Sequence, residues 1–239
     1  MRRTVRALIV AVSAVTALLA AAGCGSSGSP GASTSAAALT KPAGSTLADK
    51  VASAVTHATS VHMTGWATES GQSMYLDFSM TKSGGISGSF SLGSAADQLT
   101  FMETGGKVYF KMTPSFVKVS RLPSATCALM CGRWFEESGA SAKGMTGAFS
   151  WAGFTGSMSK PPSSATVSGP VTVDRIQTWV IHTPSDGTFY VAARGTPYPV
   201  RAIGPNGEGR IDFTNWNTAV IPPPPTKDLV SLNQLMKVG

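Results

Sequence analysis

Apolar and polar side chains alternate without a break in Met74-Tyr75-Leu76-Asp77-Phe78-Ser79-Met80. Successive side chains of a β-strand point to opposite faces, so this period of two indicates a strand with one buried and one solvated face. A Gly84-Gly85 turn follows, and the alternation resumes in residues 86–92. The two segments predict an antiparallel hairpin, and this hairpin decides the fold class of the chain.

More strands of the same kind are expected further along the chain. They cover residues 99–103, 107–112, a segment near Val167, 176–183, 188–193, 198–203 and 210–213. Turn-forming residues stand between them at Gly105-Gly106, Asp174-Arg175, Ser185-Asp186-Gly187 and Pro205-Asn206-Gly207. The proline tract 222–225 is expected to be extended, and 228–236 to add a last short strand or helix. Short alternating strands with frequent turns are typical of an antiparallel sheet.

Helices are expected before and between these strands. Thr46 followed by Asp49 has the spacing of a capping box, which predicts the start of a helix that ends near Thr59. Its apolar stripe is formed by Leu47, Val51, Ala54, Val55 and Ala58. The middle of the chain loses the alternation and predicts helices over 115–120, 124–135 and 142–158. Together these elements predict an α+β fold, a large curved antiparallel sheet with helices packed on one face.

The N-terminus has the three parts of an export signal. Arg2, Arg3 and Arg6 precede an uncharged apolar run over 7–22, which ends in small residues. The run is shorter than the roughly 20 residues that span a bilayer as a mature helix. We therefore expect residues 1–23 to be a cleaved signal peptide; an uncleaved membrane anchor is the alternative.

Cys24 follows Ala21-Ala22-Gly23, and this arrangement resembles the lipobox of bacterial lipoproteins. In a lipobox the thiol receives a diacylglycerol and becomes the new N-terminus, although a leucine usually stands where this chain has Ala21. The resemblance implies lipidation of Cys24 and attachment to the extracytoplasmic face of the cell membrane; an ordinary signal with a chance cysteine is the alternative. Residues 24–45 are rich in Gly, Ser, Pro, Ala and Thr, which predicts a lipidated flexible tether before a domain over 46–239.

Charge and motifs exclude several functions. The net charge of +7 includes the three signal arginines, and the other basic residues are scattered, so nucleic acid is not an expected partner. His57, His62 and His182 lack metal-ligand spacing, and Asp77 and Asp212 each stand alone among apolar neighbours. We expect no catalytic residue, no metal and no cofactor, and therefore no enzyme.

Cys127 and Cys131 lie close together in Cys127-Ala128-Leu129-Met130-Cys131. Outside the cytoplasm, two cysteines in one short segment most simply form a disulfide, which here would fix the turn before Trp134. A redox pair and a metal site are the alternatives, but the spacing is not the redox spacing and two sulfurs are too few ligands for a metal.

Four passages resemble the LppX/LprAFG-type lipoproteins of actinobacteria, which share the LolA-like fold. They are Ser60-Val61-His62-Met63-Thr64-Gly65, Gly105-Gly106-Lys107-Val108-Tyr109-Phe110-Lys111, Gly132-Arg133-Trp134-Phe135 and Pro197-Tyr198-Pro199-Val200-Arg201. The resemblance covers roughly residues 45–239 and implies a half-barrel of about ten strands with helices against its concave face. Two features depart from the family: Arg175 stands where a glycine is usual, and the cysteine pair is not typical.

The resemblance also implies a function, because studied members hold acyl chains between sheet and helices and some move lipids outward. The expected cavity residues here are Met74, Leu76, Phe78, Phe90, Phe101, Phe110, Phe149 and Trp151. Core packing under the helices is the alternative role of these side chains. The segment 145–158 fits either a mobile lid over the cavity or a plain packed helix. The sequence thus predicts a membrane-anchored lipoprotein that binds or carries a lipid or acylated molecule. The alternative is a non-catalytic surface adaptor or sensor with a filled core.

Overall fold

The computed structural model describes residues 39–69, 71–94, 96–138, 150–158, 165–184 and 187–231, and its elements belong to the unit Lys41–Gly239. Cys24, Phe149 and the expected signal peptide lie outside the described residues. The strands are β1 (Ser60–Glu69), β2 (Gln72–Thr81), β3 (Ile86–Leu92), β4 (Gln98–Thr104), β5 (Lys107–Met112), β6 (Trp134–Ser138), β7 (Thr166–Val173), β8 (Ile176–Thr183), β9 (Gly187–Ala192), β10 (Pro199–Ile203), β11 (Gly209–Thr214) and β12 (Leu229–Ser231). The helices are α1 (Gly44–His57), α2 (Pro114–Val119), α3 (Ser124–Met130) and α5 (Trp151–Met158), with a short 3-10 turn η2 (Pro205–Gly207).

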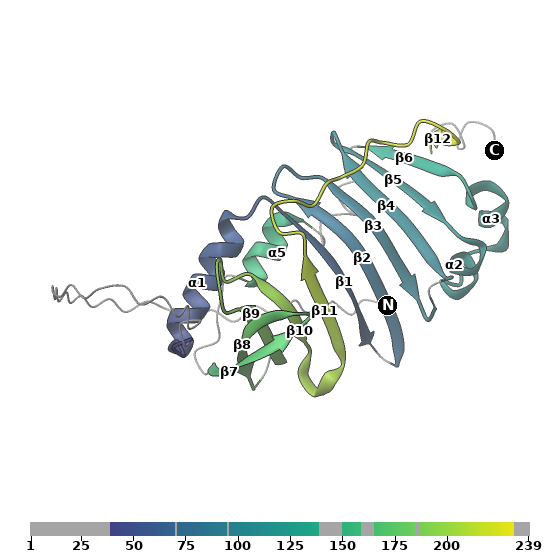
Figure 1. Cartoon of the computed structure of the whole chain (residues 1–239). Helices are drawn as coiled ribbons and strands as arrows, with labels where there is room; N and C mark the ends of the chain where they lie inside the picture. Colours follow the sequence, from purple (N-terminus) through teal and green to yellow (C-terminus); the bar gives the residue numbers. More distant parts are fainter. Residues whose placement is uncertain are drawn as a thin grey trace, which may run out of the picture. The chain divides into compact units, whose positions relative to one another are not determined.

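All described strands join one large, open, curved sheet (Figure 1). Its twelve strands follow the order β12-β6-β5-β4-β3-β2-β1-β11-β10-β9-β8-β7. Two meanders, β2 to β6 and β7 to β11, lie on either side of β1, which pairs with β11 in the register Met63 opposite Phe213. The expected α+β fold with a large curved sheet is therefore confirmed.

One strand pairing differs from the expected antiparallel sheet. β12 runs parallel to β6, with Val230 opposite Phe135, so the sheet is mixed. β6 itself corrects the expected helix over 124–135, because α3 ends at Met130 and Gly132 adopts a positive φ of 76°. Phe135 is fully buried opposite Phe110 of β5, and this burial favours a strand over another turn of helix.

Helix α1 confirms the expected apolar stripe but not its start. Leu47, Val51, Ala54 and Val55 are all buried. The helix begins at Gly44, and Ala43 at the N-cap position makes no capping hydrogen bond through its side chain. The prediction that a capping box at Thr46 starts the helix was therefore wrong. A Cβ on Gly44 would lie 2.6 Å from the carbonyl oxygen of Ala165, so a glycine allows the helix to begin against this neighbouring segment.

The two faces of the sheet differ in character. We call the face that carries Leu76, Phe78 and Met80 the inner face, and the opposite face, which carries Tyr75 and Asp77, the outer face. The helices α2 and α5 both contact the inner face, α2 through Phe116 and α5 through Phe154. In Figure 1, α2 and α3 lie together at the β5 end of the sheet, whereas α5 lies beside α1 at the other end. Among the described residues, the helices therefore contact the two ends of the inner face and not its middle.

Two glycines stand inside strands where neighbouring atoms approach closely. A Cβ on Gly65 of β1 would lie 2.1 Å from the carbonyl oxygen of Arg210, and one on Gly88 of β3 would lie 2.2 Å from the Cβ of Phe78. Both glycines occupy inner-face positions, as their partners Leu76 and Phe78 show. Glycine inside a strand typically marks a tight bend or a close approach of backbones, which fits a sheet that curves toward this face.

The edge strand β7 is irregular. Its pairing with β8 shifts register between Ser168 and Val171, around Pro170. On either side of this shift the hydrogen-bonded ladder is regular, with Val167 opposite Ile181 and Val173 opposite Ile176.

We expect Gly65→Ala to lower the free energy of unfolding by about 1–3 kcal/mol, because the added Cβ has to displace the backbone of β11. Urea unfolding followed by circular dichroism measures the change. The matched control is Gly204→Ala, whose φ is −62° and whose Cβ would meet nothing nearer than 3.5 Å. Equal stability of the two variants would contradict the close packing of β1 against β11.

Candidate functional site

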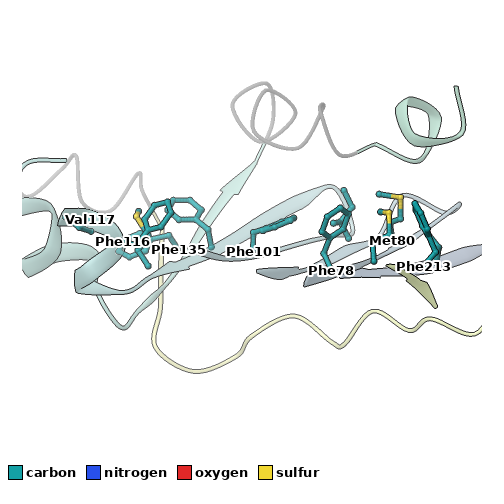
Figure 2. Packing of buried hydrophobic residues seen from close by; sticks show 12 residues of the cluster. Phe78, Met80, Phe101, Phe116, Val117, Phe135 and Phe213 are labelled. Carbon is teal, nitrogen blue, oxygen red and sulfur yellow. The ribbon is translucent and has the colours of Figure 1, made fainter. Parts of the chain in front are cut away.

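Inner-face side chains form rows, each made of residues at paired positions on neighbouring strands. The first, which we call the buried row, consists of Phe110, Phe101, Gly88, Phe78, Met63 and Phe213. All of its side chains are buried, and Figure 2 shows Phe78, Phe101 and Phe213 on the same side of the sheet. The rings of Phe78 and Phe101 lie 6.3 Å apart, and Phe110 stacks on Phe135 at 5.6 Å. This row is packed core.

A second row, two residues further along each strand, is different. We call it the open row: Leu99, Phe90, Leu76, Gly65, Ile211 and Ala202. Every member is only half-buried, and none has a polar side chain. The row crosses six neighbouring strands and spans about 24 Å, because neighbouring strands lie about 4.8 Å apart. It forms a continuous apolar strip that remains partly open to solvent.

The exposure continues toward the β1–β2 turn. The next paired positions are Leu92, Met74, Ala67 and Gly209, which are again half-buried and without polar side chains. The inner face thus grades from a filled core at one end of the strands to an accessible apolar surface at the other.

The expected cavity residues divide between these rows. Phe78, Phe101 and Phe110 belong to the buried row, and Leu76 and Phe90 to the open row. Met74 lies one row beyond, and Trp151 is half-buried on α5, where it packs against the same cluster. The structure therefore brings the described members to one face but gives them two different environments.

An aromatic group that the sequence did not indicate borders the buried row at Phe213, whose ring lies 6.2 Å from those of Phe154 and Trp216. Trp216 stacks on Tyr198 at 4.6 Å, and Phe154 of α5 lies 6.1 Å from Trp216. The indole nitrogen of Trp216 donates a hydrogen bond to the carbonyl oxygen of Pro199 over 2.9 Å. These residues come from three separate segments, so only the folded chain reveals the group.

A pocket of about 350 Å³ opens at the β10–β11 end of the open row. Ala202 and Ile211 of the open row contribute to its walls, together with Trp66, Glu208 and Arg210. The pocket therefore reaches from the open row to the exposed rim formed by β1, β10 and β11. A larger pocket, of about 710 Å³, lies away from this row among the β2–β3 and β4–β5 turns.

The opposite border of the inner face holds the cysteines. Cys127 and Cys131 form a disulfide with their Cα atoms 4.7 Å apart. Both cysteines and Met130 pack against the inner-face cluster, and Phe116 of α2 meets Phe90 of the open row edge to face at 6.2 Å. The disulfide closes the end of α3, and the bridge between Cys131 and Met112 joins that end to β5.

The outer face carries ion pairs. Arg201 donates to Asp212 and, over 2.6 Å, to Asp174, while Arg210 donates to Asp212 over 2.8 Å. His62 Nε2 lies 3.6 Å from Asp77 Oδ1. The expectation that Asp77 and Asp212 stand alone was wrong, because neighbouring strands bring a basic side chain to each. Arg201 and His62 are distant in the sequence from the carboxylates that they approach, so local pattern could not find these contacts, whereas Arg210 is only two residues from Asp212.

Within the described residues, no three His, Cys, Asp or Glu side chains are grouped so as to hold a metal. Among the helices of that same part of the chain, none is both long and apolar enough to cross a membrane.

The outer face also shifts two pKa values. Lys107 Nζ lies 2.7 Å from Glu136 Oε1, and the hydrogen bond and charge of Glu136 raise the pKa of Lys107. Burial raises the pKa of Tyr109, and the charge of Glu136 raises it further. The folded chain therefore favours the protonated form of both groups. Their contribution to stability is present at pH values below their ordinary pKa values and is lost as the pH rises through the raised pKa values.

We expect the wild-type protein to lose stability above the ordinary values of 10.0 for Tyr109 and 10.5 for Lys107. Glu136→Gln removes the negative charge, so the alkaline loss should be smaller in this variant. Urea unfolding at neutral and alkaline pH measures the difference, with the exposed Glu208→Gln as the control. If the free energy of unfolding fell equally at alkaline pH in Glu136→Gln and in the wild type, Glu136 would not be the cause of the raised pKa values.

The fold is similar to that of a solved structure. The crystal structure of LprF from Mycobacterium bovis superposes with a TM-score of 0.50 at 15% sequence identity, covering 75% of this chain and 95% of LprF. A DUF1329 family protein from Desulfovibrio piger matches with a TM-score of 0.25 at 12% identity over 74% of this chain and 93% of its own, which is too slight a likeness to support an argument. No protein-family model and no curated protein matches the sequence. The chain has the LppX/LprF-type, LolA-like fold, a curved open sheet with helices on one face.

Proposed function

We propose that this chain is a membrane-anchored lipoprotein, attached through Cys24, that binds a lipid or another acylated molecule on the inner face. The observation that carries the proposal is the open row, an unbroken strip of half-buried apolar side chains between the helices at the two ends of the sheet. Contiguous exposed apolar surface is characteristic of ligand grooves and interaction sites.

The dimensions and chemistry of the open row suit a hydrocarbon chain. A strip of about 24 Å along the strand-to-strand direction is long and narrow. Apolar surface contributes about 25 cal/mol for each Å² removed from water, so an acyl chain that covers the half-buried leucines gains on both sides of the contact. Met74 beside the strip has a flexible side chain that adapts to different chain shapes.

The proposal requires neither a catalytic group nor a cofactor from this chain. Transfer of a lipid between the anchor membrane and another acceptor breaks no covalent bond, so an apolar surface of suitable shape is sufficient. The protein would hold its ligand on the extracytoplasmic side of the membrane.

A surface adaptor or sensor with a filled core is the second candidate. It is favoured by the buried row, in which Phe78, Phe101 and Phe110 already occupy the space over one end of the strands. The two functions differ in whether the open row accepts a ligand.

We expect the Cys24→Ala chain, purified without its anchor, to take up a fluorescent fatty acid. The double variant Leu76→Gln and Leu99→Gln should bind roughly thirtyfold more weakly, because each leucine contributes about 1 kcal/mol when the ligand covers it. The matched control is Tyr75→Gln, since Tyr75 adjoins Leu76 but is 41% exposed on the outer face. Absence of uptake by the parent chain, together with a native mass free of lipid, would favour the adaptor.

We also expect Cys24→Ala to release the protein from the membrane into the medium. Two acyl chains are needed for stable residence in a bilayer, and the substituted chain has no thiol to receive them. Fractionation followed by immunoblotting measures the distribution, with Ser27→Ala as a control that should stay in the membrane. A membrane-bound Cys24→Ala chain would contradict the anchor.

A further inference from the structure

We propose that the connected helices α2 and α3 form a second membrane contact, a surface that touches anionic phospholipid bilayers. We call this surface the α2–α3 tip and define it by the exposed residues Lys118, Val119, Arg121, Leu122, Leu129 and Arg133. The inference goes beyond ligand binding on the inner face and does not depend on it.

The first observation is exposed aliphatic surface. Leu129 is 52% exposed, Leu122 40% and Val119 37%, and all three fall within one short segment of the chain. The same helices already contribute Phe116, Val117, Cys127 and Met130 to the inner-face cluster. The exposed aliphatic side chains therefore belong to the side of the helices that the core does not use.

The second observation is positive charge. Between Glu103 and Glu136 the chain contains five basic residues and no acidic one. Within the described part of the chain, no carboxylate forms an ion pair with Lys118, Arg121 or Arg133 of the tip. Apolar side chains surrounded by unpaired cations are complementary to the interface of an anionic bilayer, where headgroups attract the cations and the acyl region receives the aliphatic groups.

The disulfide fixes the position of one inserted side chain. Leu129 lies between Cys127 and Cys131, which are bonded to each other and packed against the sheet. Cys131 N also donates a hydrogen bond to Cys127 O over 3.0 Å. Leu129 is thus presented from a rigid support, so little conformational entropy is lost when it enters the bilayer.

The tip borders the open row, because Phe116 of α2 contacts Phe90. A bilayer at the tip would therefore lie next to the apolar strip, at the β5 end of the sheet in Figure 1. This proximity would shorten the path of a lipid between the membrane and the inner face.

The test uses the Cys24→Ala chain, so that the lipid anchor does not contribute, and measures its co-sedimentation with vesicles. We expect binding to vesicles of equal parts phosphatidylcholine and phosphatidylglycerol and no binding to phosphatidylcholine alone. Added salt should weaken the binding, because it screens the attraction between the tip and the headgroups. Failure of the parent chain to bind the anionic vesicles would overturn the proposal and leave the tip as a surface for a protein partner.

Two double variants assign the binding to the tip. Leu122→Ser with Leu129→Ser should weaken vesicle binding at least tenfold, and Lys118→Glu with Arg121→Glu should abolish the preference for phosphatidylglycerol. The matched control is Val171→Ser with Ile176→Ser, which removes aliphatic groups that are 41% and 44% exposed on β7 and β8. Equal losses in the control and the leucine variant would overturn the assignment, as would an unchanged lipid preference in the charge variant.

The same variants separate this inference from the proposed function. Fatty-acid uptake should be unchanged in the leucine variant at the tip, whereas Leu76→Gln with Leu99→Gln should lose uptake and keep vesicle binding. Thermal unfolding of each variant verifies that the fold is intact, and if the serine variant is destabilised, the charge variant decides the outcome alone.

Discussion

The pairing of β1 with β11 is the contact on which the rest of the structure depends. Most other neighbours in the sheet are consecutive strands joined by short turns, whereas β1 and β11 come from opposite ends of the domain. Their pairing closes a long loop of chain, whose entropic cost has to be offset by the packing it allows. It sets Phe213 beside Met63 and so joins the inner faces of the two meanders into one surface. Without this contact, each meander would expose its apolar face at the seam.

Much of the fold could be predicted from the sequence because its signals are local. The period of two identifies most of the strands, and the apolar stripe identifies α1. The errors have a common origin in distant contacts. Trp134 and Phe135 follow a helical segment, but the pairing of Phe135 with Phe110 makes them a strand. A last short strand was among the expectations for 228–236, but its parallel pairing with β6 joins distant segments and no local pattern predicts it.

The sequence could predict which face of the sheet carries the candidate site, but not which residues of that face form it. Alternation states which side chains of β2 to β5 point inward, and the structure places Leu76 and Phe78 on the inner face as expected. The alternation does not predict how deeply each side chain is buried, because burial depends on where α2 and α5 pack against the sheet. Phe78 and Leu76 are separated by a single residue, yet one is core and the other is part of the open row. The ion pairs of Arg201 could likewise not be predicted, since they join β10 to β11 and to the turn between β7 and β8.

A sheet this large has two free rims, and each exposes backbone groups able to recruit a strand from another molecule. The shifted register of β7 around Pro170 interrupts one rim, because proline has no amide hydrogen to offer an incoming strand. At the other rim, β12 is only three residues long and offers few backbone groups to an incoming strand. Irregularity at the borders thus protects the protein from polymerising edge to edge.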